Sequence, residues 1–147
     1  MSLAEAPTRS GLETLRQQLR GRAQGGIVTA LDIDLVEIDE GRAVFAGTPG
    51  RQVYNPIGTV HGGYAATLLD SACGCAVHSM LGPGEGYTTL ELKVAYHRAM
   101  TEATGEVHAE GRVVTIGRRT AFAEATLKDA AGQLYASATS TLLVMRP

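Results

Sequence analysis

The stretch from residue 61 to residue 84 reads HGGYAATLLDSACGCAVHSMLGPG, and its single formally charged residue is Asp70. Between Gly63 and Met80 the residues are mostly small or apolar, without a proline, over a length of about five helical turns. A helix that is apolar on nearly every side belongs inside a protein, with other elements packed around it. Because Gly82-Pro83-Gly84 ends the segment, the stretch predicts one long buried helix.

Alternating patterns on both sides of this stretch predict the strands that surround the helix. Two strands are expected before it, over residues 27–38 and 42–48, with Glu40-Gly41 as the hairpin turn. After it, apolar or small residues alternate with polar ones in four segments, which is typical of half-buried antiparallel strands. These segments cover residues 89–96, 102–113, 120–128 and 134–144. The order predicts an α+β fold in which one antiparallel sheet wraps a central helix.

The length of 147 residues predicts a single domain, residues 1–147, because single domains cluster near roughly 100–150 residues. A hydrophobic content of 44% is ordinary for a globular protein and argues against disorder. Residues 1–26 are expected to form a loose tail and a short amphipathic helix. In that helix, from Gly11 to about Gly21, Leu12, Leu15 and Leu19 recur at helical spacing. This helix is expected to dock on the sheet or to cap a pocket.

Charge and cysteine content exclude several classes of function. The formal net charge is -2, and the charges are spread without blocks, which gives no support for nucleic-acid binding or a polybasic membrane anchor. No apolar run approaches the roughly 20 residues that span a bilayer, and the N-terminus lacks the layout of a secretory signal. Cys73 and Cys75 point in different directions on a helix, and no second pair completes a zinc site. We therefore expect a cytoplasmic protein with no nucleic-acid, membrane or metal partner.

The start of the buried helix carries groups that suit chemistry. Two glycines, Gly62 and Gly63, leave the first backbone N–H groups uncovered by side chains. These groups lack partners within the helix and lie at the positive end of its dipole, so they can hold an anion or a developing oxyanion. Asp70 lies about two turns further on. Because a buried carboxylate without a partner is costly, Asp70 must be paired, protonated or placed at a cavity, where it is a candidate general base or nucleophile.

The spacing of these two groups limits how they can act together. Gly62 and Asp70 are eight residues apart, which is about 12 Å along a helix. One substrate carbonyl therefore cannot touch both within one chain. If both act, the sequence predicts an active site between two chains of a symmetric dimer.

The motif Asn-x-x-Gly-x-x-His-Gly-Gly-(six residues)-Asp, from Asn55 to Asp70, resembles the signature of hotdog-fold acyl-CoA thioesterases of the PaaI type. This group is similar to the Arthrobacter-type 4-hydroxybenzoyl-CoA thioesterases. Residues 89–96, Gly117-Arg118-Arg119 and the last strands also fit, so the resemblance extends from about residue 27 to residue 145. The family's strand motif usually ends with a proline, and this chain has Ala99 there.

The resemblance implies a hotdog fold and hydrolysis of an acyl-CoA to a free acid and coenzyme A. It implies no cofactor, since coenzyme A is part of the substrate, and a homodimer as the active unit within a homotetramer. Two other functions stay open. One is a non-catalytic acyl-CoA-binding module. The other is a hotdog hydratase or dehydratase, which would need a histidine with an acidic partner, and the proline-rich loop around that histidine is missing here.

The resemblance also implies catalytic roles at individual positions. The Gly62 N–H would polarise the thioester carbonyl, and Asp70 would be the general base or nucleophile. Asn55 would orient the carbonyl or the attacking water, His61 would shape the turn, and Thr89 would help to position water. Each has a structural alternative: a satisfied buried carboxylate at Asp70, a tight turn at Gly62 and a turn initiator at Asn55. The alternation places Thr89 away from the core face, so Thr88 is a rival.

Four further residues are candidates for binding the substrate. Arg118 and Arg119 would hold the phosphates of coenzyme A, because guanidinium groups suit phosphate. Two arginines at a turn are also typical of a solvated surface. Tyr64 would contact the acyl group from the first helical turn, beside Gly63.

Overall fold

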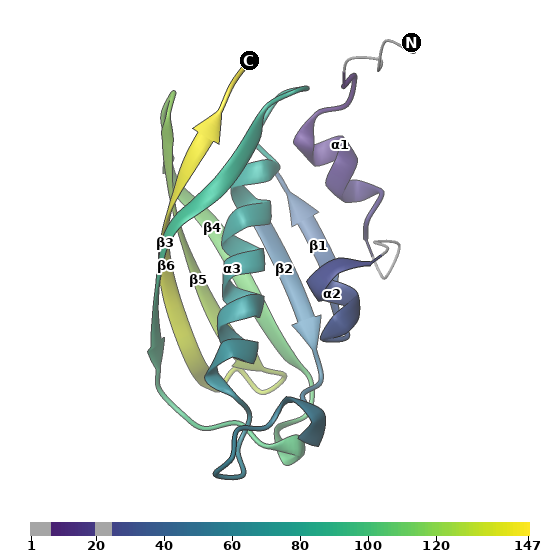
Figure 1. Ribbon diagram of the computed structural model, residues 1–147, viewed down its shortest axis with the longest axis vertical. Coiled ribbons are helices and arrows are strands. Elements are labelled where there is room, and N and C mark those ends of the chain that lie inside the picture. Colours follow the sequence, from purple (N-terminus) through teal and green to yellow (C-terminus); the bar gives the residue numbers. More distant parts are fainter. Residues whose placement is uncertain (1–6, 20–24) are drawn as a thin grey trace.

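The computed structural model describes residues 7–19 and 25–147, and its central feature is one long helix, α3, lying in the hollow of a curved sheet (Figure 1). Helix α3 spans Gly62–His78. The sheet has six strands in the order β1-β2-β4-β5-β6-β3, and every neighbouring pair is antiparallel. The strands are β1 (Ile33–Asp39), β2 (Arg42–Gly47), β3 (Gly86–Tyr96), β4 (Val107–Ile116), β5 (Thr120–Asp129) and β6 (Leu134–Met145). The predicted α+β architecture, a sheet around one central helix, is confirmed.

Small residues on the inner face let the sheet approach the helix closely. The inward residues of β5 are Ala121, Ala123, Ala125 and Leu127, and all four are buried. On β4, a Cβ atom added to Gly111 would lie 2.4 Å from the carbonyl group of Ala72 on α3. Only glycine fits at this position, because a Cβ atom at that distance would overlap the carbonyl group of Ala72. The alanines and glycines of these strands therefore let the sheet pack closely against α3.

The two edge strands, β1 and β3, lie on either side of α3 (Figure 1). Beside β1 lie two short helices, α1 (Gly11–Arg16) and α2 (Gly26–Ala30). Helix α1 docks through the buried Leu15, and the N–H of Gly11 donates to the carbonyl of Leu81 at 2.9 Å. Ser10 begins α1 with a capping box that includes Glu13. Among the described residues, no helix has the length and apolar character needed to span a membrane.

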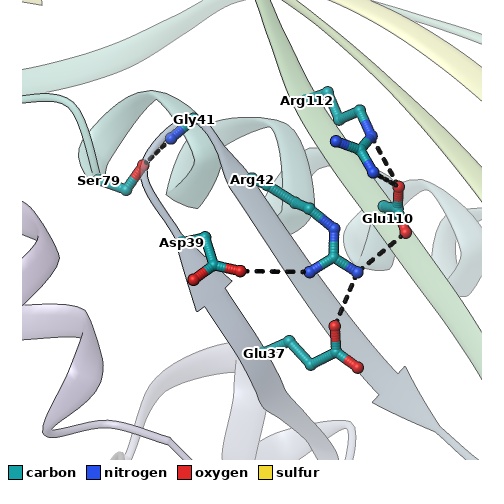
Figure 2. A network of polar contacts seen from close by, with 7 residues as sticks. All are labelled: Glu37, Asp39, Gly41, Arg42, Ser79, Glu110 and Arg112. Atoms are coloured by element: carbon teal, nitrogen blue, oxygen red, sulfur yellow. Dashed lines mark hydrogen bonds and ion pairs between the residues drawn. The ribbon is translucent and has the colours of Figure 1, made fainter.

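The β1–β2 hairpin is tied to the end of α3 and carries an ion-pair network (Figure 2). The N–H of Gly41 in the hairpin turn donates to Ser79 Oγ at 2.8 Å. Arg42 lies 2.7 Å from Glu37 and 3.1 Å from Glu110. Because Gly111 faces α3, its neighbour Glu110 points to the opposite face of the sheet. The network therefore lies on the outer face, away from α3.

Three predicted boundaries were wrong for physical reasons. The strand predicted over residues 27–38 begins only at Ile33, because Gly26–Ala30 form α2, whose N-cap Gly25 and first residue Gly26 both have positive φ. The strand predicted over residues 102–113 begins at Val107, since Glu102–Thr104 form a 3₁₀ turn. The N-terminal helix ends at Arg16 instead of near residue 21, and residues 20–24 lie outside the described part.

Candidate active site

The first turn of α3 presents a free backbone donor. His61 caps the helix: its Nδ1 accepts a hydrogen bond from the N–H of Gly63 at 2.8 Å, and its carbonyl accepts from the N–H of Tyr64 at 3.0 Å. Within residues 7–19 and 25–147, nothing accepts a hydrogen bond from the N–H of Gly62. Of the first three N–H groups of the helix, that of Gly62 is thus the one available to a carbonyl oxygen.

Gly62 lines a cavity of about 620 Å³ between α3 and the end of β3, which we call the Gly62 cavity. Val60, Ala65, Met100 and Ala136 give it apolar walls, and Arg98 adds a positive charge. Tyr96 at the end of β3 donates its hydroxyl to the carbonyl of Gly62 at 2.7 Å. The cavity can therefore receive an apolar group beside a polarising N–H.

Asp70 lies further along α3 and opens into a different cavity, of about 580 Å³, which we call the Asp70 cavity. Ile33, Leu35 and Phe45 line it with apolar surface, and Thr89 comes from β3. Thr89 Oγ1 donates to Asp70 Oδ1 at 2.9 Å. No other side-chain hydrogen bond to Asp70 is found among the described residues, so its second carboxylate oxygen can accept a proton from water.

The contact from Thr89 corrects the expectation that this residue faces away from the core. A β-bulge interrupts β3 between Thr89 and Glu91, and it resets the alternation of the strand. As a result Thr89 points toward α3, while Leu90 is 55% exposed and Thr88 is also exposed. Thr88, the rival candidate, lines neither cavity, and strict alternation could not anticipate the inserted residue.

The thiol near Asp70 is held in its protonated form. Burial raises the pKa of Cys75 to about 12, and the negative charge of Asp70 acts in the same direction. Burial likewise raises the pKa of Cys73 to about 12. A thiol with so high a pKa is a poor nucleophile at neutral pH. Asp70 is therefore a better candidate for chemistry in this cavity than either cysteine, and Asp32 and Asp34 also line the cavity.

The side chain of Asn55 forms hydrogen bonds within the loop that leads into α3. Its Oδ1 accepts from the N–H groups of Ile57 and Thr59, both at 3.1 Å, and its Nδ2 donates to Thr59 Oγ1 at 2.9 Å. These bonds form the turn that was the structural alternative for this residue. Asn55 lines neither the Gly62 cavity nor the Asp70 cavity, so its role in orienting a carbonyl or water stays a prediction.

The structure does not bring three of the candidate binding residues to these cavities. Arg118 and Arg119 are exposed in the turn between β4 and β5. Tyr64 is 4% exposed and packs in the core, where its hydroxyl has no partner among the described residues. Burial raises the pKa of Tyr64 to about 12. Gly63, in contrast, lines the Gly62 cavity as expected from its position in the first turn.

Sequence reasoning missed Tyr96 as a functional candidate. The alternation of β3 correctly placed Tyr96 on the face of the sheet that carries Leu92 and Val94. No spacing in the sequence indicates that Tyr96, 34 positions after Gly62, donates a hydrogen bond to the carbonyl of Gly62. This contact depends on the curvature of the sheet around α3.

Comparisons with known proteins identify the family of this chain. A sequence model of the thioesterase superfamily matches residues 57–136. The 1,4-dihydroxy-2-naphthoyl-CoA hydrolase of Listeria monocytogenes is 27% identical over 121 residues, which is 82% of this chain and 97% of that protein.

Two solved structures are similar in fold. The TT0310 protein of Thermus thermophilus is 30% identical, with a TM-score of 0.74 over 82% of this chain and 98% of that one. The E. coli PaaI protein from the phenylacetic acid degradation operon is 23% identical, with a TM-score of 0.74 over 81% of this chain and 83% of that one. The hotdog fold implied by the resemblance is confirmed.

Proposed function

The chain belongs to the thioesterase superfamily, and we propose that it hydrolyses an acyl-CoA thioester to a free acid and coenzyme A. The observation that carries the proposal is the pair of groups on α3. Among the described residues, the N–H of Gly62 at the helix start has no acceptor, and Asp70 has one carboxylate oxygen held by Thr89 and the other without a side-chain donor. Hydrolysis of a thioester needs both a donor for the developing oxyanion and a base or nucleophile.

The proposed reaction uses these groups in sequence. The Gly62 N–H donates to the thioester oxygen and stabilises the negative charge that develops on it. In one route Asp70 accepts a proton from water, whose oxygen attacks the carbonyl carbon. In the other route the Asp70 carboxylate attacks that carbon itself, and water then hydrolyses the resulting anhydride. In both routes the carbon–sulfur bond breaks, and the sulfur leaves as the thiol of coenzyme A after taking up a proton.

We propose that the two groups act across a dimer interface. Within one chain, Gly62 and Asp70 open into different cavities. The edge strand β3 carries the partners of both groups, Thr89 and Tyr96, and Tyr96 is 55% exposed. Exposed apolar residues on an unpaired edge favour pairing with another strand.

Antiparallel pairing of β3 with the same strand of a second copy would complete the site. If this pairing is centred near Leu92, the Thr89 end of one strand comes beside the Tyr96 end of the other. Gly62 of one protomer then faces the partner's Asp70. The homotetramer implied by the resemblance and the cytoplasmic location expected from the sequence stay predictions.

The acyl group is proposed to be aromatic, or aliphatic of short to medium length. Apolar side chains on the walls of both cavities, such as Phe45 and Met100, suit an uncharged acyl group. The Listeria relative is named for an aromatic acyl-CoA, which supports the aromatic class.

The test is thiol release from a panel of aliphatic and aromatic acyl-CoAs, with the wild type compared with Asp70→Asn. We expect turnover by the wild type and a loss of at least about 100-fold in the variant. Asp39→Asn makes the same chemical change at an exposed position outside both cavities and is expected to keep full activity. If the wild type binds acyl-CoA without releasing thiol, the protein is a binding module. If Asp70→Asn keeps its activity, Asp70 is structural.

A further inference from the structure

Tyr96 reaches from the end of β3 onto the first turn of α3. Its hydroxyl donates to the carbonyl oxygen of Gly62 at 2.7 Å. A Cβ atom added to Gly62 would lie 3.0 Å from Tyr96 Oη and 3.1 Å from Cζ. Gly62 has no positive φ, so its backbone conformation does not require glycine, but an added Cβ atom would have to displace the phenol by a few tenths of an ångström. The phenol ring lies against the position that a side chain of residue 62 would occupy.

The hydrogen bond from Tyr96 continues through the peptide group into His61. The carbonyl of Gly62 and the N–H of Gly63 belong to the same peptide group, and that N–H donates to His61 Nδ1 at 2.8 Å. Because the N–H is a fixed donor, Nδ1 must be the unprotonated nitrogen of the ring. Hydrogen bonds in such a chain polarise one another. This series of hydrogen bonds from Tyr96 to His61 fixes the orientation of the first turn. The N–H of Gly62 takes part in none of these hydrogen bonds.

We propose that Tyr96 is a positioning residue of the acyl-CoA site. Its hydroxyl acts through the Gly62–Gly63 peptide group to hold the Gly62 N–H in the direction of the substrate carbonyl. Its ring packs against Gly62 and crowds any larger residue at that position. This inference rests on the proposed function, since it assigns to Tyr96 the orientation of the donor that the function needs. Tyr96 itself does not touch the reacting atoms.

The expected size of the effect follows from how a donor stabilises an oxyanion. A donor helps only when it is aimed at the position that the oxygen occupies in the transition state, and small misplacements lower the rate. Removing the Tyr96 hydroxyl loses one hydrogen bond to the turn while the ring keeps its place in the cavity wall. We therefore expect kcat to fall by about tenfold, a change typical of one hydrogen bond. KM is expected to stay within about twofold, because the cavity keeps its shape.

The first experiment compares the kinetics of Tyr96→Phe with those of a matched control, Tyr54→Phe. Tyr54 also bonds a backbone group through its hydroxyl, accepting from the N–H of Glu102 at 2.8 Å, and it lines neither cavity. Tyr54→Phe is expected to keep kcat within about twofold, because it loses a comparable bond elsewhere. A tenfold fall in kcat for Tyr96→Phe alone, with KM unchanged, supports the proposal. Equal kcat values in wild type and Tyr96→Phe would overturn it.

The second experiment follows the backbone amides by NMR and needs no turnover. Tyr96→Phe is expected to shift the amide resonance of Gly63 in the direction that indicates a less polarised N–H. The reason is that this N–H shares a peptide group with the carbonyl that loses its donor. Tyr54→Phe should leave this resonance in place. An unchanged Gly63 resonance in Tyr96→Phe would overturn the proposal whatever the activity. If the wild type releases no thiol, the proposed function fails, while this resonance still decides whether Tyr96 orients the turn.

Discussion

Replacing Gly62 with proline deletes one backbone N–H and is expected to leave the helix intact. Gly62 is the first residue of α3, the position at which proline is most common in helices because its N–H has no partner within the helix. The residue before a proline must be extended, and His61 already has φ -60 and ψ 134. Gly62→Pro therefore removes the proposed carbonyl-binding donor from a backbone that already accommodates proline.

The fall in kcat of Gly62→Pro is measured relative to Gly62→Ala. This comparison separates the effect of losing the N–H from the effect of crowding by the added Cβ atom. Both substitutions place a Cβ atom about 3.0 Å from Tyr96 Oη, so both displace the phenol by a few tenths of an ångström. Only proline also deletes the donor. Removing one donor to an oxyanion costs about 100- to 1,000-fold in kcat. We therefore expect the kcat of Gly62→Pro to be lower than that of Gly62→Ala by about that factor.

The assay is thiol release at saturating acyl-CoA, with circular dichroism and thermal melting used to confirm that both variants are folded. The proline variant should bind substrate with similar affinity while its kcat falls, because the donor acts mainly on the transition state. If the two variants have the same kcat within about threefold, the Gly62 N–H does not stabilise the oxyanion and the reasoning is refuted.

Two further substitutions test the carboxylate and the packing of the sheet. Thr89→Val should lower kcat by about tenfold or more, because Asp70 loses its one hydrogen bond from a side chain among the described residues; unchanged thiol release would contradict the role of Thr89. Gly111→Ala places a Cβ atom 2.4 Å from the carbonyl of Ala72, so we expect Tm in a thermal melt to fall by roughly 3–10 °C. Gly117→Ala, whose nearest contact is 3.6 Å, should keep the wild-type Tm, and equal Tm values for both variants would contradict the packing of β4 on α3.

The sequence was sufficient for the architecture because its signals are local. Residues 61–84 carry one formal charge, which allows only a buried helix, and the alternation after it allows only half-buried strands. The separation of Gly62 and Asp70 was also predictable, since helical rise depends on spacing alone. The structure has these two groups open into different cavities, as that separation requires.

Other features depend on contacts between distant segments and could not be predicted. The bulge at Leu90 turns Thr89 toward Asp70, and strict alternation gave the opposite face. The short helix α2 replaces the first part of a predicted strand, because two glycines with positive φ redirect the chain where the helix begins. The contact of Tyr96 with Gly62 requires the curvature of the whole sheet.

Mixing two inactive variants tests most directly whether the site is shared between two chains. Asp70→Asn lacks the carboxylate, and Gly62→Pro lacks the N–H, so each homodimer should be inactive. In a mixed dimer, one of the two sites combines an intact Gly62 from one chain with an intact Asp70 from the other. After the variants are unfolded together and refolded at equal concentrations, we expect about a quarter of the wild-type rate of thiol release. Activity that stays at the level of the separate variants would contradict a site built from two chains.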